Sequence, residues 1–326
     1  MVKVNNVKIS GIAACVPRKI VNNNDLSDNI KLLNSIGVKK RRVVSGNQST
    51  MDLCVSAAER LIKEVNLEKD SIDAVIFVSQ TPEYQLPATA CIIQKTLDLK
   101  NDIIAYDVNL GCSGYTHGLF LASSLISSGL QNVLLLVGDT ISKIVDEEDS
   151  GSNLLFGDAG SATIISQQDG SDIGFVLGSD GSGFESIIVD SDKNGKTNNK
   201  SNYLTMKGAE VFTFTLQRIP NLIRETLSYL DLSKESVNYF IFHQANLFML
   251  KTLAENIDLD FDNFLISIDE YGNTSSASIP ITICHNREKI LRTPGKSLMA
   301  GFGVGLSWSS AVSALEDTVI LPIMEA

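Results

Sequence analysis

The predicted secondary-structure elements of this 326-residue chain occur twice in the same order, and this repeat limits the fold more than any other feature. Each half runs helix, strand, helix, strand, helix, strand, strand. The first half is predicted to hold helices 49–65, 87–97 and 113–128 and strands 73–79, 102–110, 132–138 and 161–166. The second half is predicted to hold helices 211–230, 246–257 and 276–290 and strands 237–242, 264–268, 296–300 and 307–314. Because strands that alternate with helices pair in parallel beneath those helices, the sequence predicts an α/β fold.

A shared dipeptide supports the duplication. Phe156-Gly157 and Phe302-Gly303 each precede the last strand of their half. We therefore expect an N-terminal half over residues 1–168 and a C-terminal half over residues 169–326. Two such halves pack economically with helices sandwiched between their sheets, in a five-layer αβαβα arrangement.

Two local signals add detail to this outline. Ser49 and Asp52 have the spacing of a capping box at the start of the first predicted helix. The segment 190–202 is polar and rich in Asn and Lys, which predicts an exposed loop.

Composition limits the class of protein. Hydrophobic residues make up 44% of the chain, and 27 Lys and Arg against 38 Asp and Glu give a net charge of −11. A nucleic-acid binder normally carries a basic face, so we expect no nucleic-acid partner. Five cysteines without a CxxC pair indicate a reducing compartment. Because no signal-like segment opens the chain and no apolar run is long enough to span a bilayer, we expect a cytoplasmic protein with no membrane partner.

Cys112 is the first candidate for chemistry. It lies in the small-residue run Gly111-Cys112-Ser113-Gly114, where a predicted strand ends and a predicted helix begins. The free N–H groups and the positive dipole end of a helix start favour the thiolate, which is the nucleophilic form of cysteine. The alternative is a small buried residue packed at a tight turn, which is a common role of free cysteine.

Two further polar residues are predicted to lie close to Cys112. The junction of the second half that corresponds to the Cys112 junction carries Asn273, and His243 ends the predicted strand 237–242. Parallel sheets place their sites at the carboxyl ends of strands, so a pseudo-twofold relation between the halves would bring the three residues together. Taken singly, His243 could be a core histidine and Asn273 a turn or N-cap residue.

Other sites built from these residue types are excluded. The local signatures of papain-like and caspase cysteine proteases are absent around Cys112. The Gly-rich run 301–305 cannot be a dinucleotide fingerprint, because only one strand and a short tail follow it. His117 and His285 have no partners at metal-ligand spacing. We therefore expect no metal ion at these histidines and no dinucleotide at the Gly-rich run.

Four motifs identify a family. They are GCSGY at 111–115, HQANL at 243–247, YGNTSSAS at 271–278 and GFGVG at 301–305. Together they resemble the β-ketoacyl-acyl-carrier-protein synthase III family of the thiolase superfamily. The resemblance continues through FGDAG at 156–160, SDG at 179–181 and LTM at 204–206, so that it spans nearly the whole chain. It implies a thiolase-like duplicated fold.

The resemblance also implies a chemical scheme. Cys112 takes an acyl group from an acyl-CoA or acyl-carrier-protein thioester, while the backbone N–H groups of Cys112 and Val304 stabilise the oxyanion. A malonyl group on acyl carrier protein then loses carbon dioxide, and His243 and Asn273 donate hydrogen bonds to its carbonyl. The resulting carbanion attacks the acyl-cysteine. Because loss of carbon dioxide generates the carbanion, the resemblance implies no metal ion and no bound cofactor.

The same resemblance places Phe302 and Leu86 at the substrate pocket. Family members are usually homodimers, in which Leu86 would lie near the pocket of the partner. Leu86 stands where typical members carry a gating phenylalanine.

Several other positions depart from the family. Lys31 and Ser35 stand where typical members carry a tryptophan and an arginine that hold the nucleotide end of coenzyme A. Phe248 replaces a basic residue linked to carrier-protein docking, Ala209 replaces an asparagine and Thr213 replaces another basic residue. The acyl donor therefore stays open between CoA-linked and carrier-linked thioesters.

The sequence thus predicts an acyltransferase of the 3-oxoacyl-ACP synthase type, for fatty acid or related biosynthesis. One alternative is an acyltransferase on the same scaffold that passes the acyl group from Cys112 to a hydroxyl or an amine. A second alternative is a non-catalytic partner subunit. Against this last alternative, the chain retains Cys112, His243 and Asn273 together.

Overall fold

Two long antiparallel strands, β1 (Val2–Val16) and β7 (Ala159–Ser179), form the centre of the fold. The computed structural model describes residues 1–190 and 202–326, so the loop predicted over 190–202 lies almost entirely outside the described residues. β1 pairs first with the later part of β7 and then with its earlier part, which ends with Cys15 opposite Gly160. Both strands therefore pass from one half of the protein into the other.

The other long strands extend this pair on two sides. β6 (Asn132–Asp139), β4 (Ala74–Val78) and β5 (Ile104–Val108) follow in order from the earlier part of β7. β12 (Ser307–Ala314), β11 (Lys296–Gly303) and β10 (Tyr239–Phe242) follow from its later part. β4 is parallel to β5 and β6, and β10 is parallel to β11, as expected for strands joined through helices. The predicted boundary after residue 168 falls inside β7, which both halves share.

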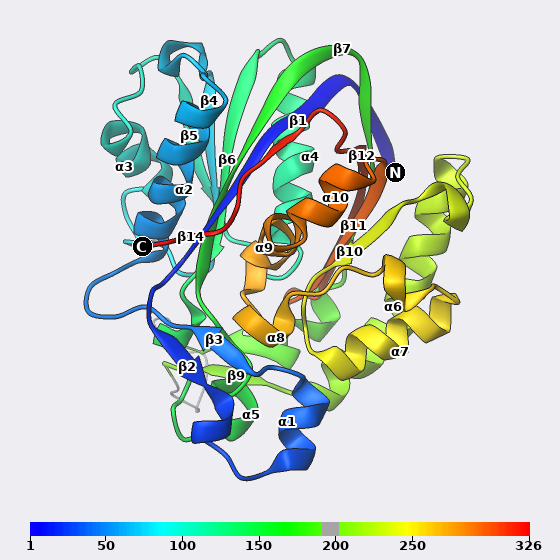
Figure 1. Ribbon diagram of the computed structural model, residues 1–326. Helices are drawn as coiled ribbons and strands as arrows, with labels where there is room; N and C mark the ends of the chain where they lie inside the picture. Colours follow the sequence, from blue (N-terminus) through cyan, green and yellow to red (C-terminus); the bar gives the residue numbers. More distant parts are fainter. Residues whose placement is uncertain (191–201) are drawn as a thin grey trace.

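Helices cover the sheet in three layers (Figure 1). The outer layer of the first half holds α2 (Thr50–Glu64) and α3 (Thr89–Thr96), and that of the second half holds α6 (Gly208–Tyr229) and α7 (Leu247–Ile257). Between the halves lie α4 (Gly114–Ser127) and α9 (Ser278–His285). This is the five-layer αβαβα arrangement of two similar halves that the sequence predicted. None of the helices within the described residues has the length and apolar character needed to cross a bilayer.

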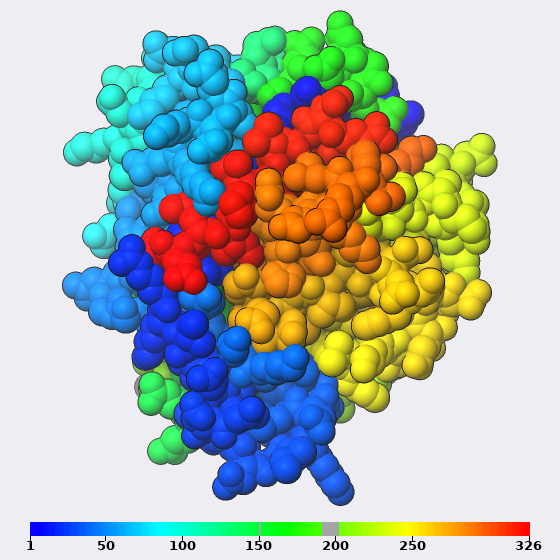
Figure 2. All heavy atoms as spheres, in the orientation of Figure 1, coloured from blue at the N-terminus to red at the C-terminus, as the bar shows by residue number. Residues whose placement is uncertain are grey.

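Shorter elements complete the chain. They are β2 (Ile20–Asn22), α1 (Ile30–Ile36), β3 (Lys40–Arg42), α5 (Ser150–Asn153), β8 (Ile187–Val189), β9 (Leu204–Met206), α8 (Ile268–Tyr271), α10 (Arg287–Arg292), β13 (Val319–Ile320) and β14 (Met324–Glu325). β2 pairs with β3, and β8 pairs with β9. β13 and β14 pair with β1, and Figure 2 shows this C-terminal segment lying on the surface between the two halves.

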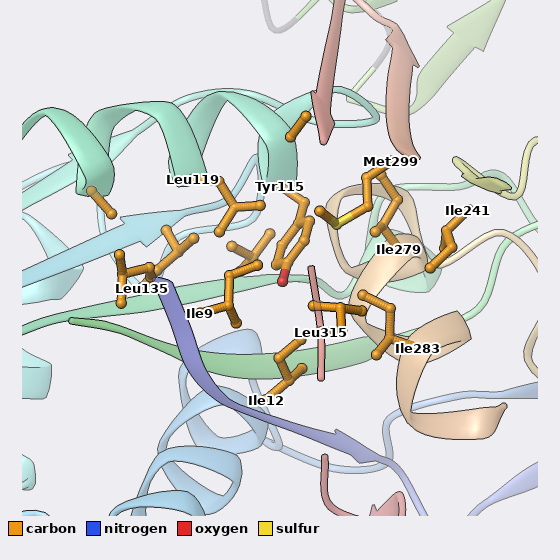
Figure 3. Packing of buried hydrophobic residues seen from close by; sticks show 14 of the residues in the cluster. Ile9, Ile12, Tyr115, Leu119, Leu135, Ile241, Ile279, Ile283, Met299 and Leu315 are labelled. Carbon is orange, nitrogen blue, oxygen red and sulfur yellow. The ribbon is translucent and has the colours of Figure 1, made fainter. Parts of the chain in front are cut away.

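The central apolar cluster holds the two halves together. Tyr115 and Leu119 of α4 and Ile279 and Ile283 of α9 all belong to this one cluster (Figure 3). All four side chains are fully buried. Each side chain of this size contributes about 1.5–3 kcal/mol when it is removed from water. The starts of α4 and α9 are therefore held near each other by packing between the halves.

The strand predicted over 264–268 is not formed. Phe264 makes only a single bridge to β10, although the segment is apolar enough for a strand. The side chain of Gln244 donates to the carbonyl of Leu265 and accepts a hydrogen bond from the N–H of Ser267. Because one side-chain amide occupies the backbone groups that a strand ladder would use, this part of the prediction is wrong.

Two further differences have local causes. The helix predicted over 276–290 is divided into α9 and α10 at Asn286, whose side chain donates to the carbonyls of Thr282 and Ile266. The sequence reading also missed β1, where apolar residues alternate only irregularly with polar ones. Its identity as a strand comes from its long pairing with β7.

The capping box at the start of α2 is confirmed and yields a stability prediction. Ser49 Oγ accepts from the N–H of Asp52 at 3.2 Å, and the Asp52 carboxylate accepts from the N–H of Ser49 at 2.8 Å. We expect Ser49→Ala to lower the free energy of unfolding by about 1 kcal/mol in a denaturant titration, because an N–H group of the helix start loses its acceptor. Ser56→Ala, on the same helix, is the matched control and should change stability by less than about 0.5 kcal/mol. Equal losses in the two variants would contradict the cap.

Candidate active site

Cys112 lies at the turn between β5 and α4, two residues before α4 begins. This turn packs against the glycine-rich segment 301–305, which comprises the end of β11 and the first residues of the turn to β12. A Cβ atom at Gly301 would lie 2.9 Å from the carbonyl oxygen of Cys112, and one at Gly303 would lie 2.9 Å from Cys112 Sγ. Gly303 also has a φ of +152°, a conformation that other residues rarely adopt. Glycine at position 303 therefore makes room for the sulfur.

The pKa of the Cys112 thiol reflects opposing influences. Burial raises this pKa to about 11, and the nearby carboxylate of Asp139 acts in the same direction. The backbone N–H groups of Val304 and Cys112, with the hydroxyl of Ser275, lower it. The N–H groups thus favour the thiolate, as the sequence indicated, but burial has the larger effect on this pKa. What the structure does show is two backbone donors directed at one sulfur.

His243 follows the last residue of β10 and is 1% exposed. Its Nδ1 lies 2.7 Å from Ser278 Oγ, at the start of α9. Burial lowers the pKa of His243 to about 3, so the ring is uncharged at neutral pH. When the Ser278 hydroxyl donates to Nδ1, the ring proton lies on Nε2, which is the nitrogen left for the pocket.

Asn273 is held by both halves of the protein. Its backbone N–H donates to the carbonyl of Leu155, and its carbonyl accepts from the N–H of Gly157. Its side-chain Oδ1 accepts from the N–H of Ser275 at 2.9 Å. This hydrogen bond turns the amide so that Nδ2, which has one distant partner at 3.4 Å in the carbonyl of Ala245, is the group available for a ligand.

One pocket of about 90 Å³ joins these groups. Cys112, His243, Asn273, Phe302 and Val304 all line it, as the sequence predicted. Apolar residues from β8, β9 and α6 form much of the remaining wall, including Ile187, Leu204, Met206 and Val211. Polar groups that converge at one part of an apolar pocket suit a ligand with a reactive carbonyl and an apolar chain.

Leu86 is the predicted site residue that this pocket does not contain. Its side chain is 83% exposed on the loop between β4 and α3. The assignment of Leu86 to the substrate pocket therefore does not hold within one chain, because its loop carries the side chain out to the surface. The family resemblance had placed it near the pocket of a partner.

The other positions that depart from the family lie on α1, α6 and α7. Lys31 and Ser35 belong to α1, a helix without fully buried residues that packs against α7. On α7, Phe248 is 53% exposed, and its ring stacks on Phe212 of α6 with centroids 5.6 Å apart. The chain thus presents a pair of aromatic rings where the resemblance led us to look for positive charge.

Asp139 is a site residue that the sequence reading missed. It ends β6, is fully buried and accepts hydrogen bonds from Ser276 Oγ at 2.6 Å and from the N–H of Gln80 at 2.7 Å. Because Ser276 belongs to the second half, the Asp139 carboxylate ties the two halves together beside Cys112. Nothing local in the sequence marks it, since an aspartate at a strand end is common.

Comparison with known proteins decides the family. The profile for 3-oxoacyl-[acyl-carrier-protein (ACP)] synthase III matches residues 106–181, and the profile for the C-terminal part of that synthase matches residues 227–315. The β-ketoacyl-[acyl-carrier-protein] synthase III of Clostridium acetobutylicum is 34% identical, over 95% of this chain and 98% of that protein. This chain belongs to the 3-oxoacyl-ACP synthase III family.

Solved structures of the 3-oxoacyl-ACP synthase III family agree with this assignment. The 3-oxoacyl-(acyl-carrier protein) synthase of Burkholderia xenovorans LB400 is 41% identical with a TM-score of 0.95, and the match covers 100% of this chain and 98% of that one. The 3-oxoacyl-[acyl-carrier-protein] synthase III of Aquifex aeolicus VF5 is 30% identical with a TM-score of 0.87, over 94% of this chain and 99% of that one. The resemblance read from the four motifs is confirmed.

The contact between Gly303 and the sulfur can be tested directly. We expect Gly303→Ala to slow alkylation of Cys112 by iodoacetamide by about tenfold or more, because the new methyl group displaces Sγ. Peptide mass mapping separates Cys112 from the exposed Cys91. Gly181→Ala is the control, since a Cβ atom there meets nothing within 4 Å. Unchanged alkylation in Gly303→Ala would show that the sulfur does not occupy this position.

Proposed function

We propose that this family member is a β-ketoacyl-ACP synthase III-type condensing enzyme in which Cys112 carries the acyl group and His243 and Asn273 serve the condensation. One observation supports this most strongly: three reactive or donating side chains from distant parts of the chain line a single, largely apolar pocket. Their roles follow from the atoms that each leaves free.

In the first half-reaction, Cys112 Sγ attacks the carbonyl carbon of an acyl thioester. A new C–S bond forms, the bond to the departing sulfur breaks, and the thiol proton of Cys112 ends on the departing thiol. The oxyanion formed during attack lies beside Sγ, where the N–H groups of Cys112 and Val304 already converge. Because burial raises the pKa of the thiol, stabilisation of negative charge by these two donors is essential.

In the second half-reaction, a malonyl thioester loses carbon dioxide. The electron pair of the broken C–C bond moves into the thioester carbonyl, and the enolate oxygen accepts hydrogen bonds from His243 Nε2 and Asn273 Nδ2. Since His243 is uncharged, it acts as a hydrogen-bond donor rather than as an acid. The enolate carbon attacks the acyl carbon on Cys112, the C–S bond breaks, and the sulfur takes up a proton. The product is a β-ketoacyl thioester.

The proposed partners follow from this scheme. Acyl carrier protein delivers the malonyl group, and the acyl donor is a thioester of coenzyme A or of a carrier protein. The scheme requires no metal ion and no bound cofactor, because loss of carbon dioxide generates the carbanion. All five cysteines are free, which suits the reducing cytoplasm where we place the enzyme.

The stacked pair Phe212 and Phe248 supports one competing activity. These uncharged rings stand where the family resemblance implies a basic residue linked to carrier-protein docking, which favours a small hydroxyl or amine compound as the second substrate. The enzyme would then be an acyltransferase that forms an ester or an amide from the acyl group on Cys112.

Separate variants distinguish loading from condensation. We expect Cys112→Ala to abolish the acyl adduct seen by intact-protein mass spectrometry. His243→Ala should still load the acyl group, but its condensation rate should fall by about 100-fold or more because an enolate donor is lost. Asn273→Ala should behave like His243→Ala. Loading that survives in Cys112→Ala would contradict the assigned nucleophile.

Product analysis of the unmodified enzyme tests the type of reaction. Carbon dioxide release and a β-ketoacyl product from malonyl carrier protein support the condensing enzyme. Ester or amide formation without carbon dioxide release supports the acyltransferase instead. Failure of every acyl thioester to form an adduct would favour the non-catalytic subunit.

We also propose that the enzyme is a homodimer. Within the described residues β5 is an edge strand with β4 as its neighbour, and Ile104 at its start is 41% exposed. Tyr84 and Leu86, on the loop before α3, are 60% and 83% exposed. An open strand edge beside exposed apolar side chains suits pairing with a second copy of the chain. Leu86 would then reach the pocket of the partner, as the family resemblance implies.

Disruption of this edge should change the oligomeric state. We expect Ile104→Lys to raise the dissociation constant of the dimer by about tenfold or more, because a charge would be buried between the β5 edges of two copies. Light scattering after gel filtration measures this change. Ile30→Lys on α1 is the matched control, since Ile30 is 70% exposed and distant in sequence from β5. Dimers of unchanged stability in Ile104→Lys would rule out this interface.

A further inference from the structure

Two turns from opposite halves of the protein supply the N–H groups that face Cys112 Sγ. The nucleophile turn, residues 111–114, contributes the N–H of Cys112, and the oxyanion turn, residues 303–305, contributes that of Val304. Two donors stabilise one oxygen only when their separation stays constant during the reaction. Some contact must therefore hold the two turns in register.

Ser307 makes that contact. Its Oγ donates to the carbonyl of Val304 at 2.7 Å and lies 2.7 Å from Ser113 Oγ. Ser113 and Ser307 are 0% and 3% exposed, so water does not compete for these bonds. Since a hydroxyl has one proton and Ser307 gives its proton to Val304, Ser113 must be the donor to Ser307. A directed chain of hydroxyls thus runs from the residue after the nucleophile to the oxyanion turn.

The other end of the chain is also anchored. The carbonyl of Ser113 accepts from Thr116 Oγ1 at 3.2 Å and lies 3.3 Å from Ser309 Oγ and 3.1 Å from His117 Nδ1. Ser309 and Ser307 share one face of β12, because side chains alternate along a strand. That face of β12 therefore contacts the nucleophile turn at two points, the hydroxyl and the carbonyl of Ser113.

We propose that Ser307 is a positioning residue that, through Ser113, sets the separation of the two oxyanion donors. The inference rests on the proposed function, since an oxyanion forms there only during acyl transfer. It extends that function by assigning a role to a residue that does not touch the reacting atoms. Ser307 acts through the carbonyl of Val304, which limits rotation of the peptide groups around that residue.

The test compares three changes on β12. Ser307→Ala removes the link, Ser307→Thr keeps a hydroxyl, and Ser310→Ala is the matched control. Ser310 is equally buried and makes a hydroxyl bond of 2.6 Å, but to Thr226 on the opposite face of the strand. Ser113→Ala leaves the bond from Ser307 to Val304 intact and serves as a second variant should Ser307→Ala fail to fold.

The first measurement is the rate of acyl transfer to Cys112. We expect Ser307→Ala to lower kcat for loading about 10- to 100-fold while KM changes less than about threefold, because donor alignment affects the transition state more than binding. Ser113→Ala should show a smaller loss of the same kind. Ser307→Thr should recover to within about threefold of the unmodified enzyme, and Ser310→Ala should not differ from it. If Ser310→Ala lowered kcat as much as Ser307→Ala, the effect would come from the general packing of β12. That result would overturn the proposal.

The second measurement does not depend on the proposed function. The N–H of Val304 lowers the pKa of Cys112, so a loosened oxyanion turn should raise that pKa and slow iodoacetamide alkylation of Cys112 at pH 8 by about three- to tenfold. The titratable groups around the sulfur and its turn are Asp139 of β6, His243 after β10 and His117 of α4, and none of them is altered.

The two measurements separate two kinds of failure. If the unmodified enzyme forms no acyl adduct, the proposed function fails. The alkylation rates of Cys112 in the variants then still show whether Ser307 positions the N–H of Val304. If the unmodified enzyme loads acyl groups and Ser307→Ala matches it in both measurements, the positioning role is wrong and the proposed function stands.

Discussion

The antiparallel pairing of β1 with β7 is the constraint on which the rest of the structure depends. Both strands run through the two halves, so the halves cannot move as separate bodies without breaking the ladder of backbone hydrogen bonds that joins these strands, which two register shifts interrupt. This shared pair orients the two half-sheets toward each other and leaves one layer between them. The apolar faces of α4 and α9 fill that layer. Because the starts of both helices then lie close together, the pocket forms between the halves.

Three polar contacts between the halves lie near the pocket. The carboxylate of Asp139 accepts from Ser276, the backbone of Asn273 bridges to the segment around Phe156, and Ser307 bonds toward Ser113. Each of these groups would be costly to bury alone, so their pairing favours one relative placement of the halves over slightly shifted ones. The same contacts that make the packing specific therefore also align the reactive groups.

Burial keeps the two titratable groups that line the pocket uncharged at neutral pH. It raises the pKa of Cys112 and lowers that of His243, and in each case it outweighs the hydrogen bonds that favour the charged form. A site of this kind binds uncharged thioester groups readily and stabilises negative charge only where N–H donors converge. The location of those donors, rather than a preformed ion pair, then determines which bond reacts.

The sequence by itself determined the order of most elements and the family, and it pointed to Cys112, His243 and Asn273, because these depend on local patterns and on motifs that are contiguous in the chain. Only the tertiary structure decided the protonation state of the Cys112 thiol, because Asp139 and the residues that bury the sulfur come from distant segments of the chain. The same holds for the absent strand at 264–268, where the side chain of Gln244 replaces a neighbouring strand. It holds as well for Ser307, whose bond to Ser113 joins residues that no local pattern relates. Long-range contacts of this kind depend on how the halves pack, and packing is not encoded in any single stretch of sequence.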